Sequence, residues 1–120
     1  MGQIAGQRVA TIDVKVCGLN TPEAVAAACA SGATHIGFIF YPPSPRAVSP
    51  ETAGTIAAAA PKTIIQVAVF VDPSDVEIQA VIKALSPHLL QLHGHESPER
   101  VAEVKQRFGL PAMKAVRVSS

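Results

Sequence analysis

The chain has 120 residues, of which 48% are hydrophobic and 16% charged, and its formal net charge is +1. This balance is typical of a soluble globular domain and excludes a disordered tail. With no basic run and only 4% aromatic residues, the chain lacks the surface that nucleic-acid binding needs. Its apolar stretches are about strand length, so we expect no membrane partner either.

The N-terminal dozen residues contain one basic residue, Arg8, and no long apolar core, so we predict no signal peptide and a cytoplasmic location. Cys17 and Cys29 form no CxxC pair and no metal-ligand cluster with histidine. We expect both to be free thiols in a reducing cytosol, and we predict no metal site.

Apolar, β-branched runs alternate with alanine-rich helical segments along the chain. In chain order the pattern predicts strand Val14–Cys17, helix Pro22–Ser31, strand His35–Phe40, helix Pro50–Ala60, strand Ile64–Val71, helix Pro73–Leu85, strand Leu89–Leu92, helix Pro98–Phe108 and strand Ala112–Val118. Three helices begin with Ser or Thr, then Pro and Glu, and Asp72-Pro73-Ser74-Asp75 is a variant of that start.

This alternation indicates βαβ units and a parallel sheet. The strands start 21 to 29 residues apart, and eight such units would need roughly 200 residues, the lower end of the (βα)8-barrel range. The pattern leaves two α/β architectures open. One is a partial TIM barrel of four βα units plus a fifth strand, and the other is a doubly wound, flavodoxin-like domain of five strands.

Function in βα units collects where strands end. Lys15 and Cys17 share one face of the first strand because side chains alternate. An ammonium near the thiol would favour the thiolate, a usable base or nucleophile. The same cysteine could instead be a small buried hydrophobe.

After the second strand, four prolines stiffen the segment Tyr41–Pro50 around Arg46, whose guanidinium suits a carboxylate or phosphate. An ordinary exposed arginine is the alternative. Asp72 closes the third strand, and we expect it to begin the next helix or to pair with a base such as Arg46. Gln91 and His93 share a face at the end of the fourth strand, where His93 could line a site or carry a proton, or serve only the structure.

Taken in order, five motifs resemble the phosphoribosylanthranilate isomerases of tryptophan biosynthesis. They are Lys15-Val16-Cys17-Gly18 with Thr21-Pro22-Glu23, Gly37-Phe38-Ile39-Phe40 with Ser44-Pro45-Arg46-Ala47-Val48, Val69-Phe70-Val71-Asp72, Gln91-Leu92-His93-Gly94-His95-Glu96, and Met113-Lys114-Ala115-Val116. The resemblance divides the chain into an N-terminal extension, residues 1–13, and the N-terminal half of an isomerase barrel, residues 14–120.

The resemblance implies an Amadori rearrangement of N-(5-phosphoribosyl)anthranilate to 1-(2-carboxyphenylamino)-1-deoxyribulose 5-phosphate. An acid opens the furanose ring, a base removes the C2 proton, and the enolamine becomes a ketone, so no cofactor is expected. By resemblance Cys17 is the general base, Arg46 holds the anthranilate end, and Lys15, Gln91 and His93 complete the substrate-binding side.

The family's general acid is an aspartate after the fifth strand, and its phosphate site lies after the seventh and eighth strands. Neither role falls on a residue of these 120. The resemblance therefore implies that the chain is inactive alone and that the C-terminal half-barrel is a partner. A self-standing small-ligand binding module of flavodoxin-like type is the alternative function.

Overall fold

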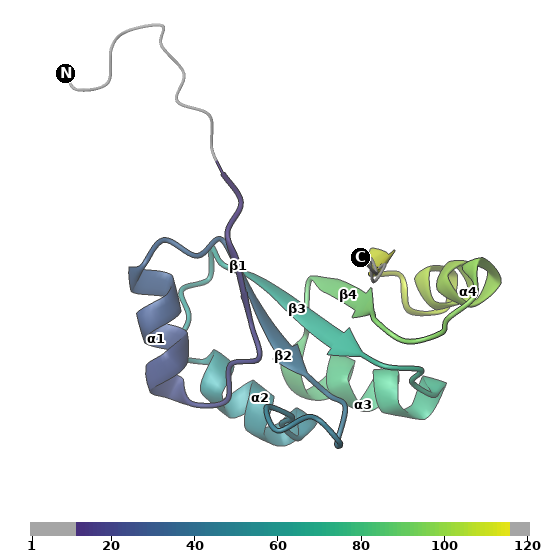
Figure 1. The fold of residues 1–120 in the computed structure, drawn as a ribbon, viewed down its shortest axis with the longest axis horizontal. Helices are drawn as coiled ribbons and strands as arrows, with labels where there is room; N and C mark the ends of the chain where they lie inside the picture. The colour runs from purple at the N-terminus through teal and green to yellow at the C-terminus, as the bar shows by residue number, and fades with distance from the viewer. Residues whose placement is uncertain (1–11, 116–120) are drawn as a thin grey trace, which may run out of the picture.

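A computed structural model describes residues 12–115, in which five strands alternate with four helices (Figure 1). The strands are β1 (Lys15–Cys17), β2 (His35–Ile39), β3 (Ile65–Phe70), β4 (Leu89–Leu92) and β5 (Ala112–Lys114). The helices are α1 (Pro22–Ala30), α2 (Pro50–Ala57), α3 (Asp75–Leu85) and α4 (Pro98–Phe108). The proposed extension lies mostly outside the described residues, as does the predicted continuation of β5 to Val118.

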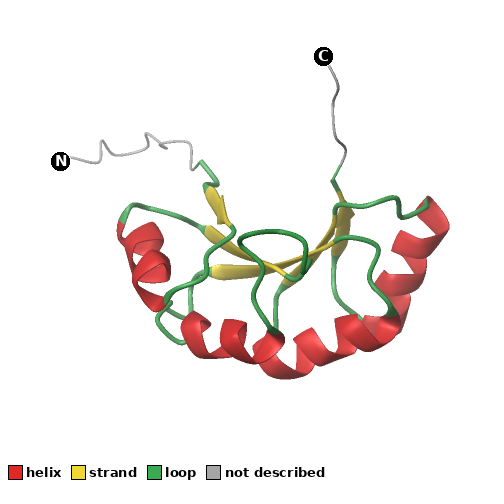
Figure 2. Cartoon of the chain, turned by 60° about the horizontal axis from the view of Figure 1, so that its bottom comes forward, coloured by secondary structure: helices red, strands yellow, loops and turns green. Residues whose placement is uncertain are grey.

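All four strand pairs are parallel, and each strand lies beside its predecessor in the chain, in the order β1-β2-β3-β4-β5. The sheet curves like a trough, and the helices cover its convex side (Figure 2). A doubly wound domain needs helices on both faces and a reversal of strand order. The flavodoxin-like alternative is therefore wrong, and the predicted partial barrel, with an open sheet, is confirmed.

The core lies between the sheet and the helices. Phe38, Phe70 and Leu90 are among its fully buried side chains, and the rings of Phe40 and Phe70 stack with centroids 5.6 Å apart. Because side chains alternate along a strand, the other set faces the concave side. Val67 and Val69 belong to that second set and are buried there.

Three predicted helix limits differ from the observed ones. The first helix ends at Ala30 instead of Ser31, which is its C-cap, and the two larger differences lie beside a proline. The third helix begins at Asp75 instead of Pro73, because Ser74 caps it and forms a reciprocal capping box with Glu77. Asp72, expected to begin this helix, has a φ of 46° and lies before it. The second helix ends at Ala57 instead of Ala60, since residues 58–60 tighten into i→i−3 turns ahead of Pro61.

The described helices include none that is long and apolar enough to cross a bilayer.

Candidate active site

The first strand ends in a turn that presents Cys17 at the mouth of the trough. Cys17 pairs with Gly37 of β2, and the N–H groups of Gly18 and Leu19 both donate to the Gly37 carbonyl, at 3.0 and 3.3 Å. Gly18 has a φ of 80°, which an L side chain rarely adopts. A Cβ at Gly37 would lie 2.8 Å from Cys17 Sγ, so the thiol occupies the space that this glycine leaves open.

Arg46 lies over the same turn. A Cβ at Gly18 would lie 2.7 Å from Arg46 Cδ and 3.4 Å from its Nη1, which puts the guanidinium beside the residue that follows Cys17. The loop of Arg46 folds back onto β2, where Val48 N donates to Ile39 O at 3.0 Å and Ala47 bridges Ile39. Cys17 and Arg46 therefore share one end of the sheet.

Lys15 and Gln91 meet across the concave face. Lys15 Nζ donates to Gln91 Oε1, although the two residues belong to β1 and β4. Gln91 is 8% exposed. Only a strongly curved sheet brings side chains from strands three positions apart into contact, so this hydrogen bond reports barrel-like curvature. It also holds the ammonium on the face that Cys17 shares.

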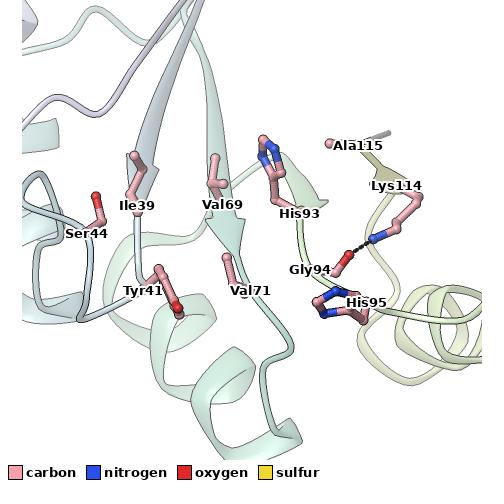
Figure 3. A pocket seen from close by; sticks show the side chains of 10 residues that line it. All are labelled: Ile39, Tyr41, Ser44, Val69, Val71, His93, Gly94, His95, Lys114 and Ala115. Carbon is pink, nitrogen blue, oxygen red and sulfur yellow. Dashed lines mark hydrogen bonds between the residues drawn. The ribbon is translucent and has the colours of Figure 1, made fainter. Parts of the chain in front are cut away.

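A pocket of about 600 Å³ opens at the carboxyl ends of β2 to β5 (Figure 3). It is lined by Ile39, Tyr41, Ser44, Val69, Val71, His93, Gly94, His95, Lys114 and Ala115. Of the site residues predicted from sequence, His93 is in this lining. Arg46 is connected to it through its own loop, because its backbone N–H donates to Ser44 Oγ at 3.2 Å.

Asp72 and His95 meet at the rim of this pocket. The backbone N–H of His95 donates to Asp72 Oδ1 at 2.7 Å, and His95 Nδ1 lies 3.5 Å from Asp72 Oδ2. The suggested pairing of Asp72 with Arg46 is thus replaced by a contact with the loop after β4. The His95 side chain is 98% exposed. A Cβ at Gly94 would lie 2.7 Å from the Asp72 carboxyl atoms.

An ion pair with a buried carboxylate, missed by the sequence analysis, lies behind the pocket. The Glu96 side chain is 1% exposed. Its Oε1 accepts from Gly94 N at 2.9 Å and from Lys114 Nζ at 2.8 Å, and its Oε2 accepts from Asp72 N at 2.8 Å. Lys114 Nζ also donates to Gly94 O. The carboxylate therefore connects the ends of β3, β4 and β5.

Burial by itself raises the pKa of Glu96, but the hydrogen bonds from Lys114 and from backbone N–H groups outweigh it and hold the pKa below its usual range. In the sequence Lys114 lies inside the predicted strand Ala112–Val118, and only the structure shows that β5 ends at this lysine. The rule that function collects at strand ends applies to it as it does to Cys17 and His93.

Within residues 12–115, no group of three or more His, Cys, Asp or Glu side chains is arranged to hold a metal ion. The mouth instead offers a thiol, a guanidinium, imidazoles and an ammonium. These groups can transfer protons and bind anions.

Comparison with known proteins places these motifs in one family. The family model for N-(5'-phosphoribosyl)anthranilate (PRA) isomerase matches residues 14–120. The N-(5'-phosphoribosyl)anthranilate isomerase of Brucella canis is 52% identical over 107 residues, which are 89% of this chain and 48% of the relative. The chain thus spans about half the length of the curated relatives it matches.

Solved structures agree. A phosphoribosyl anthranilate isomerase in complex with reduced 1-(o-carboxyphenylamino)-1-deoxyribulose 5-phosphate is 36% identical and superimposes with a TM-score of 0.84, over 91% of this chain and 55% of that one. The isomerase from Thermus thermophilus is 35% identical with a TM-score of 0.81, over 90% and 53% of the two chains. From the family match over residues 14–120 and these structural likenesses, we conclude that the chain belongs to the phosphoribosylanthranilate isomerase family.

Proposed function

We propose that this chain forms the N-terminal side of an N-(5-phosphoribosyl)anthranilate isomerase site and that its substrate lies in the concave mouth. The observation that carries the proposal is the shared position of Cys17 and Arg46 at the end of β1 and β2. A thiol and a guanidinium lie at the same turn there, and in this proposal they supply the base and the anion-binding group for an aldose–ketose rearrangement of a carboxylated substrate.

In this proposal the Cys17 thiolate takes the proton from C2 of the ring-opened substrate, and the resulting enolamine becomes the ketone. The Arg46 guanidinium binds the anthranilate carboxylate, since its planar donors match two carboxylate oxygens. Lys15 and Gln91 form the floor of the mouth through their mutual hydrogen bond. His93 lines the wall beside the substrate.

The acid that opens the ring and the groups that bind the phosphate come, in this proposal, from a C-terminal half-barrel. The 120 residues alone are then inactive, because loss of acid catalysis forfeits about 10²–10⁴-fold in rate and loss of phosphate binding removes most substrate positioning. A cytoplasmic location is part of this proposal.

The test is turnover of N-(5-phosphoribosyl)anthranilate by this chain mixed with a separately expressed C-terminal half of the Brucella canis relative. We expect turnover from the mixture and none from the chain alone. Cys17→Ala should lower kcat about 10²–10⁴-fold, the usual contribution of a general base. Cys29→Ala is the matched control, because Cys29 lies on α1 and packs toward the core.

Besides absence of turnover in the wild-type mixture, two results would contradict the proposal. One is wild-type turnover by the Cys17→Ala mixture, and the other is full turnover by the 120 residues without the second half.

A further inference from the structure

Among residues 12–115, Glu96 is the one charged residue that is buried. A buried carboxylate is costly unless its lone pairs are satisfied. Here they accept two backbone N–H groups and one ammonium, which come from the loop after β3, the loop after β4 and β5 itself.

The segments that Glu96 joins form much of the pocket wall. Five of the ten lining residues, His93, Gly94, His95, Lys114 and Ala115, belong to the two stretches at the ends of β4 and β5 (Figure 3). The Lys114 ammonium, bound to Gly94 O as well as to Glu96, joins those stretches directly. Glu96 itself is absent from the lining of this pocket, so any effect it has on a ligand passes through these neighbours.

We propose that Glu96, with Lys114 as its counter-ion, is a positioning residue that sets the wall of the pocket around His93. The predicted effect of Glu96 on turnover rests on the proposed function. The predicted effect of Glu96 on the two loops does not depend on that function. Gln cannot replace Glu96, because an amide offers one acceptor oxygen where the carboxylate offers two. In Glu96→Gln, either Asp72 N–H or Gly94 N–H faces an NH₂ group and loses its acceptor.

Protonation of Glu96 itself would remove acceptor capacity from the arrangement, and four titratable groups face this carboxylate. They are Lys114 from β5, Lys105 from α4, Asp72 from the loop after β3, and His95 on its own loop. The Lys114 hydrogen bond is foremost among the interactions that lower the Glu96 pKa against the effect of burial. Its removal raises that pKa, so Glu96 takes up a proton and loses acceptor capacity at a higher pH.

The experiment uses the two-chain barrel described above, with this chain labelled by ¹⁵N. Amide exchange at Asp72 and Gly94 is compared in wild type, Glu96→Gln, Lys114→Met and the control Glu99→Gln. Glu99 is exposed and lies in the first turn of α4, so its substitution removes a carboxylate near the same helix N-terminus. In Glu96→Gln we expect exchange at Asp72 or Gly94 to accelerate about 10- to 100-fold, while slow amides of β2 keep their wild-type rates.

Turnover supplies the second measurement. For assembled barrels we expect Glu96→Gln to lower kcat/KM about 10- to 100-fold and Glu99→Gln to leave it unchanged. In Lys114→Met the pH below which the Asp72 and Gly94 amides lose their protection, after correction for the intrinsic exchange rate, should move upward, because Glu96 then takes up its proton at a higher pH. Adding Glu96→Gln should abolish this movement. General destabilisation would instead accelerate slow amides throughout the sheet and leave the pH at which this protection is lost in place.

The outcomes separate the two proposals. Absence of turnover in the wild-type mixture contradicts the proposed function, and amide exchange then decides the role of Glu96 in the loops. Unchanged exchange at Asp72 and Gly94 overturns the positioning role, as does accelerated local exchange with unchanged kcat/KM. If Glu96→Gln fails to assemble, the same amide exchange rates at Asp72 and Gly94, and their dependence on pH, are measured in Lys114→Met instead.

Discussion

Gly37 leaves the space that the Cys17 thiol occupies. A methyl group there would lie 2.8 Å from Sγ, whereas its nearest other neighbours, Cα and Cβ of Cys17, are 3.5 Å away and in ordinary contact. The φ of Gly37 is outside the left-handed region, so the thiol is the main obstacle to a larger residue at this position.

We therefore predict that the effect of Gly37→Ala depends on residue 17. With Cys17 present, the thiol must leave its rotamer, which costs roughly 0.5–1.5 kcal/mol of unfolding free energy and lowers kcat in the two-chain barrel. With Cys17→Ala the clash disappears, and Gly37→Ala should stabilise by about 0.4–1 kcal/mol through the lost chain entropy of glycine. Urea unfolding of the four variants measures this reversal of sign, and an equal cost in both backgrounds would rule the explanation out.

The placement of residues whose signal is local was predictable from sequence, whereas their roles remain proposals. Cys17 ends the first strand and Arg46 lies in the loop after the second, each in a short, distinctive motif, and the structure places both at the same turn. The Glu96–Lys114 pair depends on a contact across 18 residues. Lys114 is in register with the buried Leu92, so alternation alone would direct it into the core. Its role as the counter-ion of Glu96 emerges only from the folded arrangement of the loops.

At the scale of single elements, helix α3 shows how a cap outweighs a proline. Ser74 Oγ accepts from Glu77 N at 3.2 Å, and Glu77 Oε1 accepts from Ser74 N at 2.8 Å. Pro73 stays outside the helix, and its carbonyl accepts from Arg100 Nη2 at 3.0 Å. At the other three helices a proline directly follows the capping residue, and this motif suggested Pro73 as the start of α3. Here the order is shifted, because the capping residue Ser74 follows the proline.

We predict that Ser74→Ala destabilises the chain by about 1 kcal/mol, since it leaves a helix N–H without its acceptor. Ser86→Ala is the control at the other end of α3. Ser86 is exposed with a φ of 53°, so its substitution carries some backbone strain but removes no N-terminal cap. Urea unfolding combined with amide exchange at Glu77 distinguishes the two, because only Ser74→Ala should expose that N–H. Slow exchange at Glu77 in Ser74→Ala would contradict the capping role.

At the scale of the whole molecule, the side of the sheet on which the helices lie could not be derived from the strand and helix pattern. Both a half-barrel and a doubly wound domain alternate strands with helices, and the two differ only in how each crossover packs. The family resemblance decided between them, and the structure confirms it. The Lys15–Gln91 hydrogen bond is direct evidence for the half-barrel, because it crosses a concave face and a flat sheet has none.

The open trough exposes apolar groups that a closed barrel would bury. Ile65 and Met113 are 37% and 46% exposed, and their register places them on the concave side with Val67 and Gln91. In addition, within residues 12–115 β1 and β5 each have a single neighbour in the sheet, so their outer backbone groups are unpaired in that part of the chain. Such edges pair readily with other chains.

We accordingly predict that the 120 residues alone self-associate as their concentration rises and that an equimolar C-terminal half converts them to a one-to-one complex. Sedimentation velocity across a concentration series measures both. Met113→Lys should weaken self-association, because a charge on the edge strand β5 opposes strand pairing. Val76→Lys is the matched control, since Val76 is 79% exposed but lies on α3, away from the concave face. If Val76→Lys weakened self-association as much as Met113→Lys, the concave face and the edge strand would not be the surface through which the chains associate. Self-association would then give no support for a second half-barrel that covers the concave face.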